Sequence, residues 1–244
     1  MLAHNEKAQH EIEHGVLLAS QDTEKSWGWG TPAGKIRARR RAKLIIAASE
    51  LNFHKKVLEI GCGTGLFTEI FAETGANIIA VDISPELLQK AKARNLPPTV
   101  QVLEKRFEDC DLDGPFDVIL GSSILHHLAV RTALAKIYEL LKPGGVISFA
   151  EPNFLNPQVF LERKLRKWFP YTSPDEIAFV RWHLKKDLEE AGMIKIEITP
   201  FDWLHPFTPE KIIPQVKSFG DVLEKTPILK EFSGSLLIRA ERPE

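Results

Sequence analysis

Residues 57–66 constrain the fold more than any other stretch, because they read Val-Leu-Glu-Ile-Gly-Cys-Gly-Thr-Gly-Leu. Strand-compatible residues lead into three glycines at alternate positions, Gly61, Gly63 and Gly65, and an amphipathic stretch over residues 66–73 follows at once. This order predicts a strand, a tight turn and a helix. Glycine tolerates positive φ angles and lets a ligand approach bare backbone, so three glycines at the carboxyl end of a strand indicate a nucleotide-like ligand.

The spacing of these glycines argues against a phosphate-binding turn. A Walker loop places Gly-Lys-Ser/Thr after its glycines, whereas two apolar residues follow the third glycine here. The alternate spacing also departs from the dinucleotide fingerprint Gly-x-Gly-x-x-Gly. A second predicted strand over residues 77–82 ends in Asp82, at about the 20-residue distance expected for an acid that binds a ribose. An ionised carboxylate there can accept hydrogen bonds from both hydroxyls of one ribose.

The glycine turn resembles closely the Glu/Asp-x-Gly-x-Gly-x-Gly signature of class I S-adenosylmethionine-dependent methyltransferases. Residues 114–121 look like the fourth strand of that family, and residues 140–147 look like its helix-to-strand turn. The resemblance covers residues 55–151. It implies a Rossmann-like α/β fold, with helices on both faces of a seven-stranded, mostly parallel sheet whose last strand is antiparallel. It also implies S-adenosylmethionine as the cofactor and S-adenosylhomocysteine as the product.

The resemblance also assigns residues to the cofactor site. The cofactor-binding residues that it implies are Glu59, Gly61, Cys62, Gly63, Gly65, Asp82, Ile83, Phe107, Gly121 and Ser122. The family usually offers an acid to the adenine amino group after the third strand, and Arg106 stands at that position here. Two alternatives follow: Glu108 or Asp109 takes over this contact, or Phe107 and the backbone hold the adenine alone.

Strand and helix patterns alternate along most of the chain. Helices are predicted over residues 43–52, 84–95 and 131–141, with another ending at Gly192, and further strands over residues 99–103, 146–150, 194–199 and 235–240. Such alternation implies a parallel sheet with helices on both faces.

A length of 244 residues suits one methyltransferase domain. Within it we expect an N-terminal lid or arm over residues 1–42 and a cofactor-binding core over residues 43–150. Residues 151–181 and 201–232 are longer than ordinary connections and rich in aromatic side chains, so we expect helical, aromatic insertions that cap the substrate pocket.

Two tryptophans among glycines precede an arginine-rich run in the N-terminal segment. They could simply pack on the domain above an exposed basic helix face. The alternative is that Trp29 forms a lid, and that Arg37 or Arg40 binds the methionine carboxylate or an anionic substrate group. The predicted substrate-pocket residues are Trp29, Arg37, Glu151, Tyr171 and His183, with Asp202 and His205 as further polar candidates.

Methyl transfer from a sulfonium is an in-line displacement, so the protein has to align donor and acceptor and, for a hydroxyl or ammonium acceptor, remove a proton. His127 or His126 follows the fourth predicted strand and is the candidate base. The alternative is that these histidines only pack or hold the turn. No tight ligand spacing indicates a metal, so none is expected.

Charge and composition narrow the partners. A net charge of −1 disfavours nucleic acid as a substrate or partner. The chain has two cysteines, and its first residues do not resemble a signal peptide. It also has no long apolar run, so we expect a cytoplasmic protein. The basic and aromatic run over residues 163–169 leaves contact with a membrane surface as an alternative. Nothing in the residues indicates an oligomeric state.

We therefore expect a methyltransferase that acts on a small-molecule or on a lipid- or sugar-linked metabolite. A protein or RNA methyltransferase is the competing hypothesis, although the Asn/Asp-Pro-Pro-Tyr/Phe motif is missing after residue 120. A noncatalytic protein that binds S-adenosylmethionine is the third.

Overall fold

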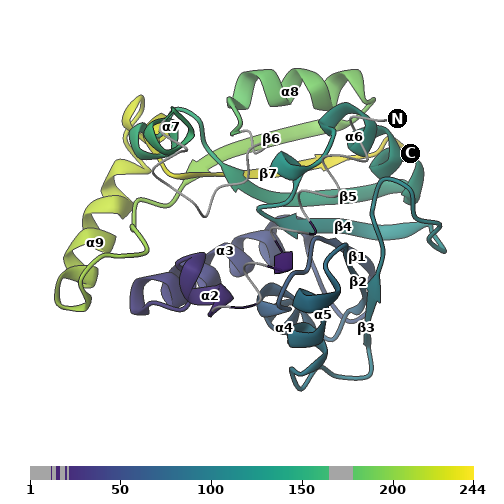
Figure 1. The fold of residues 1–244 in the computed structure, drawn as a ribbon. Helices are drawn as coiled ribbons and strands as arrows, with labels where there is room; N and C mark the ends of the chain where they lie inside the picture. The colour runs from purple at the N-terminus through teal and green to yellow at the C-terminus, as the bar shows by residue number, and fades with distance from the viewer. Residues whose placement is uncertain (1–11, 13–14, 17–19, 21, 165–177) are drawn as a thin grey trace.

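The structure, a computed structural model, describes residues 12, 15–16, 20, 22–164 and 178–244 (Figure 1). A single seven-stranded sheet has the order β3-β2-β1-β4-β5-β7-β6. The strands β1 to β5 are parallel, and β7 is antiparallel to both of its neighbours. The strands are β1 (Lys56–Ile60), β2 (Asn77–Asp82), β3 (Val100–Glu104), β4 (Phe116–Ser122), β5 (Leu141–Pro152), β6 (Ile194–Phe201) and β7 (Ser235–Glu241). This topology confirms the predicted fold class.

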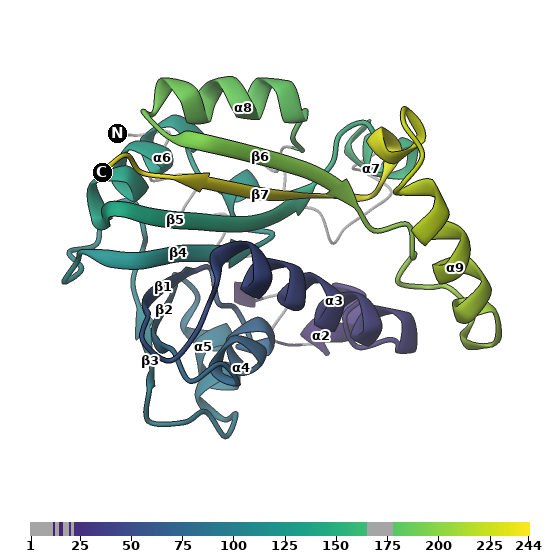
Figure 2. The same cartoon turned by 180° about the vertical axis from the view of Figure 1, so that it is seen from behind.

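Helices cover both faces of the sheet. The helices are α2 (Thr23–Ser26), α3 (Pro32–Ser49), α4 (Leu66–Ala72), α5 (Pro85–Lys92), α6 (Val130–Leu140), α7 (Pro157–Lys164), α8 (Arg181–Glu190) and α9 (Ile213–Leu223), and the 3-10 turns are η1 (Leu125–His127), η3 (Glu210–Ile212) and η4 (Leu229–Phe232). Helices α3 and α4 pack on the face that is nearer the viewer in Figure 2. Helices α6 and α8 contribute to the core of the opposite face.

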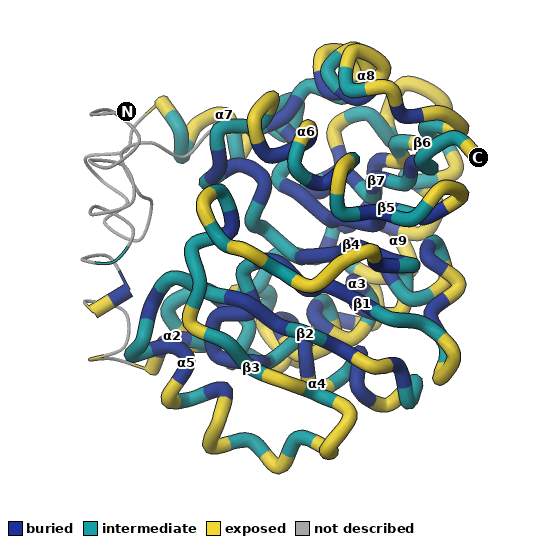
Figure 3. The backbone as a smooth tube through the Cα atoms, turned by 90° about the vertical axis from the view of Figure 1, so that its right-hand side faces the viewer, coloured by how far each residue is buried: buried dark blue, intermediate teal, exposed yellow. Residues whose placement is uncertain are grey.

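The central strands supply side chains to both cores. In β4, Ile119 packs in the core with α6 and α8, whereas Val118 and Leu120 pack in the core with α3 and α4. All three side chains are completely buried, and the buried stretches of the tube run through the middle of the molecule in Figure 3. Burial on both faces explains why these strands read as continuous apolar runs and lack polar alternation.

Helix α3 begins earlier than predicted. The Thr31 hydroxyl accepts a hydrogen bond from the Gly34 amide at 2.9 Å, and Pro32 occupies the first turn. Both features start helices. The predicted helix over residues 43–52 is therefore the second half of a longer helix, and the boundary drawn at residue 42 falls inside it.

The two predicted insertions meet at one end of the sheet, where Figure 1 shows α7 and α9. Residues 151–181 contain α7, and residues 201–232 contain η3, α9 and η4. The Asn153 side-chain amide donates to the carbonyls of Glu231 and Ser233 at 2.8 Å each, and Arg181 forms an ion pair with Glu231 at 2.7 Å. These contacts fasten one insertion to the other. Within the described part of the chain, no helix has the length and apolar character needed to cross a membrane.

Candidate active site

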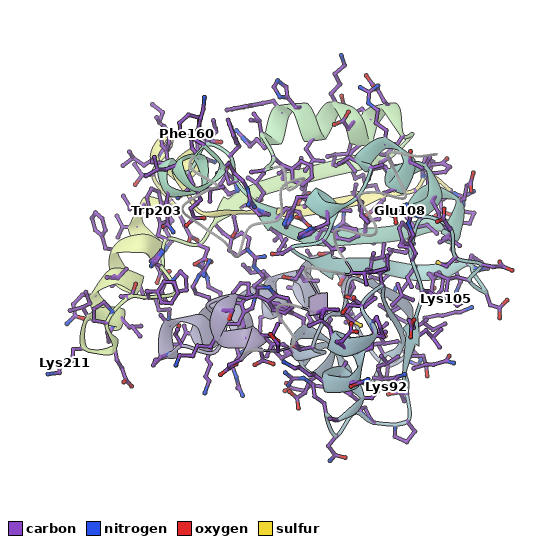
Figure 4. All side chains as sticks on the ribbon, in the orientation of Figure 1. Lys92, Lys105, Glu108, Phe160, Trp203 and Lys211 are labelled. Carbon is purple, nitrogen blue, oxygen red and sulfur yellow. The ribbon has the colours of Figure 1, made fainter. Side chains whose placement is uncertain are left out.

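A cavity of about 440 Å³ lies at the carboxyl ends of the parallel strands. The loops after β1, β2, β3, β4 and β5 contribute to its wall, together with the N-terminal segment and the insertion before β7. Figure 4 shows Trp203 on the side of α9, and Lys105 and Glu108 on the opposite side, at the end of β3. All three residues line the cavity. A cleft of this size at this edge is where open α/β sheets bind nucleotide-like ligands.

The glycine turn after β1 forms one wall of the cavity. Gly61 has a φ of +69°, and a Cβ atom there would lie 2.5 Å from the side chain of Ile124. Another side chain would therefore be strained by the backbone and would clash. The amides of Gly61 and Cys62 both donate to the Val81 carbonyl, at 2.8 and 3.1 Å. These bonds hold the turn against the end of β2.

Asp82 ends β2 and faces this turn. Its Oδ2 accepts the amide of Gly63 at 2.7 Å, and its Oδ1 accepts the amide of Ser84 at 2.9 Å. Burial raises the pKa of Asp82, whereas the amides of Ser84 and Gly63 and the charge of His127 act in the opposite direction. Each carboxylate oxygen has a second lone pair. The carboxylate is thus fixed in orientation and can still accept a hydrogen bond from a ligand hydroxyl.

The loop after β3 forms the neighbouring wall. Phe107 is 3% exposed and lines the cavity, as do Arg106 and Glu108. Arg106 forms ion pairs with Asp109 at 2.9 Å and with Glu108 at 3.7 Å. Asp109 does not line the cavity. Of the two acids considered for the adenine contact, only Glu108 lines the cavity.

The segment before α3 closes over the glycine turn. A Cβ on Gly63 would lie 3.3 Å from the Trp27 ring, so this ring rests directly on the turn. Arg94 donates to the Thr64 carbonyl at 2.7 Å and also forms an ion pair with Glu24. One guanidinium therefore ties the N-terminal segment to the turn.

The same segment is tied to the insertion that precedes β7. The Thr31 hydroxyl donates to the Pro206 carbonyl, and Arg37 forms an ion pair with Asp202 at 2.8 Å. The ring of Trp29 lies under the Arg37 guanidinium, at 5.2 Å from the ring centroid. Together these contacts form a roof over the cavity, built from residues 22–37 and 201–207.

A histidine and a glutamate are paired beside the end of β4. His126 Nδ1 lies 2.6 Å from Glu151 Oε2, and Glu151 Oε1 accepts the amides of Ile124 and Leu125 at 2.9 Å each. Burial alone would raise the pKa of Glu151, but the charge and hydrogen bond of His126 and the two amides outweigh it and lower the pKa. An ionised carboxylate only accepts hydrogen bonds, so Nδ1 of His126 donates and Nε2 is the basic nitrogen.

His127 occupies the other side of this turn. Its ring lies 4.2 Å from the His126 ring, and both residues line the cavity. The charge of His127 acts against the rise in the pKa of Asp82 that burial causes, so His127 lies near Asp82. The structure therefore gives the two adjacent histidines different surroundings.

Glu59, two residues before Gly61, is 1% exposed and does not line the cavity. Burial and the charge of Asp82 raise its pKa to about 8, so the buried carboxyl is largely neutral at pH 7. In the unfolded chain the same group ionises near its usual value of 4.5. The folded state then holds a proton that the unfolded state releases, and stability falls as the pH rises between these two values.

Replacing Glu59 by glutamine should remove this pH dependence. At about pH 8 the free energy of unfolding of the variant is expected to exceed that of the wild type by roughly 1 to 4 kcal/mol. At about pH 5 the two free energies of unfolding should be nearly equal. Urea unfolding of both proteins across this range measures the difference. Curves of unfolding free energy that run parallel in the two proteins would contradict the raised pKa.

Many of the predicted site residues meet in the cavity. Its wall includes Gly61, Cys62, Gly63, Asp82, Ile83, Phe107, Ser122, His126, His127, Trp29, Arg37, Asp202 and His205. The described residues contain no group of three or more histidine, cysteine, aspartate or glutamate side chains that could hold a metal.

Other predicted residues do not line the cavity. Gly65 begins α4 with a φ of +76°, and Gly121 packs against Ile124, so both shape the backbone beneath the wall. Glu151 is completely buried behind His126. His183 is exposed on α8 and is not in the pocket, because that helix packs against the sheet through Leu184 and Leu188. Tyr171 lies outside the described residues.

Sequence reasoning missed several residues of the wall, including Arg41 and Thr64. Arg41 follows Arg40 directly in the arginine run and is 3% exposed. Its signal was its helical phase: Ala38, Ala42 and Ile45 are all buried on the same helix. A charged residue in that phase points inward.

Comparisons with known proteins agree with this geometry. Residues 57–145 match the family model described as a methyltransferase domain. A ubiquinone biosynthesis O-methyltransferase of Xanthomonas oryzae pv. oryzae is 30% identical over 151 residues, which are 59% of this chain and 62% of that relative. The protein of the same name from Xanthomonas campestris pv. campestris is 35% identical over 151 residues, which are again 59% of this chain and 62% of that relative. The match thus spans less than two thirds of the length of these relatives.

Solved structures share the fold across most of the chain. The N-methyltransferase NodS of Bradyrhizobium japonicum, solved with S-adenosylhomocysteine, has a TM-score of 0.65 at 18% identity and covers 96% of this chain and 98% of its own. A phosphoethanolamine N-methyltransferase of Haemonchus contortus has a TM-score of 0.66 at 16% identity, over 91% of this chain and 57% of its own. By its strand order this chain has the fold of these methyltransferases, and its residues 57–145 match a methyltransferase domain.

Proposed function

We propose that this protein transfers a methyl group from S-adenosylmethionine to a small-molecule acceptor. The observation that carries this proposal is one continuous cavity with an oriented carboxylate, Asp82, on one side and the His126 and Glu151 pair on the other. Asp82 would accept the ribose hydroxyls, the turn at Gly61 and Gly63 would contact the methionine part, and Phe107 with Glu108 would hold the adenine. The cavity therefore has groups for the cofactor and, beyond them, a base.

The proposed acceptor atom is a hydroxyl oxygen, and a phenol or catechol fits best. The sulfonium of S-adenosylmethionine already carries a good leaving group, the thioether. The protein therefore has only to align the two reactants and to remove the hydroxyl proton. His126 Nε2 would take this proton while Glu151 stabilises the resulting imidazolium. The aromatic residues Trp29 and Trp203 suit a planar acceptor. The matched relatives are named O-methyltransferases of ubiquinone biosynthesis, which favours an oxygen over a nitrogen acceptor. An acceptor linked to a lipid or a sugar belongs to the same proposal.

The cofactor is tested by calorimetric titration with S-adenosylmethionine, S-adenosylhomocysteine and, as a control, NAD. We expect micromolar binding of the first two and none of NAD. Binding of NAD alone would overturn the proposal.

Activity is tested next, by release of S-adenosylhomocysteine during incubation with catechols. Cofactor binding without release with any catechol, protein or RNA acceptor would instead support a noncatalytic S-adenosylmethionine-binding protein. Release with a protein or RNA alone would assign the chain to that class of methyltransferase.

A further inference from the structure

Three arginines of α3 reach toward the roof, and they differ in their partners. Arg37 pairs with Asp202 at 2.8 Å, and Arg40 forms two hydrogen bonds with Glu224, one of them at 2.8 Å. Arg41 forms no ion pair with any described residue, although it is the most buried of the three. Arg41 is therefore a buried cation without a carboxylate partner among the described residues, and it lines the cavity.

The hydrogen-bond partners of Arg41 are all neutral. Its Nη1 donates to the hydroxyl of Ser123 at 2.8 Å, to the hydroxyl of Ser122 at 3.3 Å and to the carbonyl of Ala150 at 3.2 Å. Its Nη2 donates to the hydroxyl of Ser235. The Nε atom is buried and has no hydrogen-bond partner among the described residues. The aromatic faces of Trp29 and Phe201 lie 5.3 and 5.7 Å from the guanidinium.

The nearest acids do not neutralise Arg41. Asp202 and Glu151 raise its pKa from a distance, but Asp202 is paired with Arg37 and Glu151 with His126. Loss of hydration and the charge of Arg37 bring the pKa of Arg41 down to about 10, so it stays charged at neutral pH. A buried charge without a counter-ion destabilises the fold, and proteins normally pair such charges. The cavity therefore favours an anionic ligand.

The strands that Arg41 contacts indicate whether the anionic ligand is the cofactor or the acceptor. Its partners come from the ends of β4 and β5 and the start of β7, whereas Asp82 and Phe107 lie at the ends of β2 and β3. In the strand order, β1 separates these two groups. Arg41 thus lies in the half of the cavity that also holds the His126 and Glu151 pair.

We propose that Arg41 binds a carboxylate on the acceptor, so that the protein selects an aromatic hydroxy acid over the neutral form of the same ring. This inference rests on the proposed function. Arg41 would bind the carboxylate beside Trp29 in the cavity, with the hydroxyls of Ser122, Ser123 and Ser235 fixing the guanidinium. The acceptor hydroxyl would then lie toward His126.

The test uses two catechols that differ in charge. Protocatechuate carries a carboxylate, and protocatechuyl alcohol has a neutral hydroxymethyl group at the same ring position. Their affinities are measured by calorimetry on the full chain saturated with S-adenosylhomocysteine, for the wild type and for Arg41→Met, Arg41→Lys and the control Arg40→Gln. Arg40 pairs with Glu224 outside this cavity and does not line it.

We expect the wild type to bind the acid at least about tenfold more tightly than the alcohol. Arg41→Met should lose this preference, Arg41→Lys should keep part of it, and Arg40→Gln should keep all of it. If Arg41→Met does not fold, the comparison of the wild type with Arg41→Lys still tests the proposal. Lysine lacks the bidentate guanidinium, so Arg41→Lys should show a smaller preference for the acid over the alcohol. Equal affinities in the wild type, or no binding of the acid, would overturn the proposal.

The cofactor carboxylate is the competing ligand for Arg41. If Arg41→Met weakens S-adenosylhomocysteine but not methylthioadenosine, which lacks the amino-acid part, the guanidinium serves the cofactor and the proposal is wrong. Failure of the wild type to bind S-adenosylhomocysteine at all would instead overturn the proposed function. The two failures are therefore distinguishable.

Discussion

Replacing His126 by glutamine is expected to lower kcat by about 10²- to 10⁴-fold, the range that a positioned base contributes. Glutamine is close in size to histidine and can still reach Glu151, but it cannot accept a proton at neutral pH. The affinity for S-adenosylhomocysteine should stay unchanged, because Asp82 and the glycine turn are untouched. The measurement is steady-state turnover with a catechol acceptor, combined with calorimetry.

Replacing Glu151 by glutamine should have an effect of the same order. The Glu151 Oε1 position still receives the amides of Ile124 and Leu125, so the side-chain nitrogen of the variant must face His126 Nδ1. This donor forces the other histidine tautomer, in which Nε2 carries the proton and cannot act as a base. Glu151 is therefore a positioning residue.

The matched control is His127→Gln, which should change kcat by less than about tenfold. A larger loss in this variant than in His126→Gln would make His127 the base. Turnover within about twofold of the wild type in all three variants would mean that alignment alone drives the reaction and that the histidines only pack.

Replacing Asp82 by alanine is expected to weaken cofactor binding by about 1.5 to 3 kcal/mol, which corresponds to roughly 10- to 150-fold in Kd. The ribose would lose its charge-assisted hydrogen bonds, and the amides of Gly63 and Ser84 would lose their acceptor. Calorimetric titration with S-adenosylhomocysteine measures the change. Thermal unfolding separates it from loss of the fold.

Two further variants refine this result. Asp82→Asn keeps the shape of the side chain and removes its charge, so its Kd should lie between those of the wild type and Asp82→Ala. Asp109→Ala removes an acid from the loop after β3 that does not line the cavity, and its Kd should match the wild type. An unchanged affinity in Asp82→Ala would exclude Asp82 from the ribose site.

The sheet and the cavity wall formed by the glycine turn and Asp82 could be predicted from the sequence because local rules determine them. Gly61 is required by a positive φ and a close neighbour, and Asp82 follows a strand at a fixed distance from it. Both signals are short-range, and both residues line the cavity. The start of α3 was missed even though Thr31 and Pro32 form a clear start signal, because the tryptophans beside them were read as a loop.

The acceptor half depends on contacts between residues far apart in the chain, and its details could not be predicted. Glu151 is a predicted polar group of the pocket, yet the turn after β4 covers it and takes both of its oxygens. The sequence favours Arg37 or Arg40 as the arginine of the pocket, although an acid 165 residues later neutralises Arg37. The packing of α3 on the insertion that precedes β7 determines which of these arginines is paired with an acid, and this packing cannot be read from the sequence.

The roof has a consequence for how such a protein can diversify. Its parts, residues 22–37 and 201–207, lie outside the matched methyltransferase domain of residues 57–145, and they hold each other through Arg37 and Asp202. Changes of acceptor can therefore accumulate in two short stretches of the chain while the cofactor machinery stays constant. Exchanging both stretches together between homologous chains should transfer acceptor preference, whereas exchanging one alone would separate the arginine from its acid.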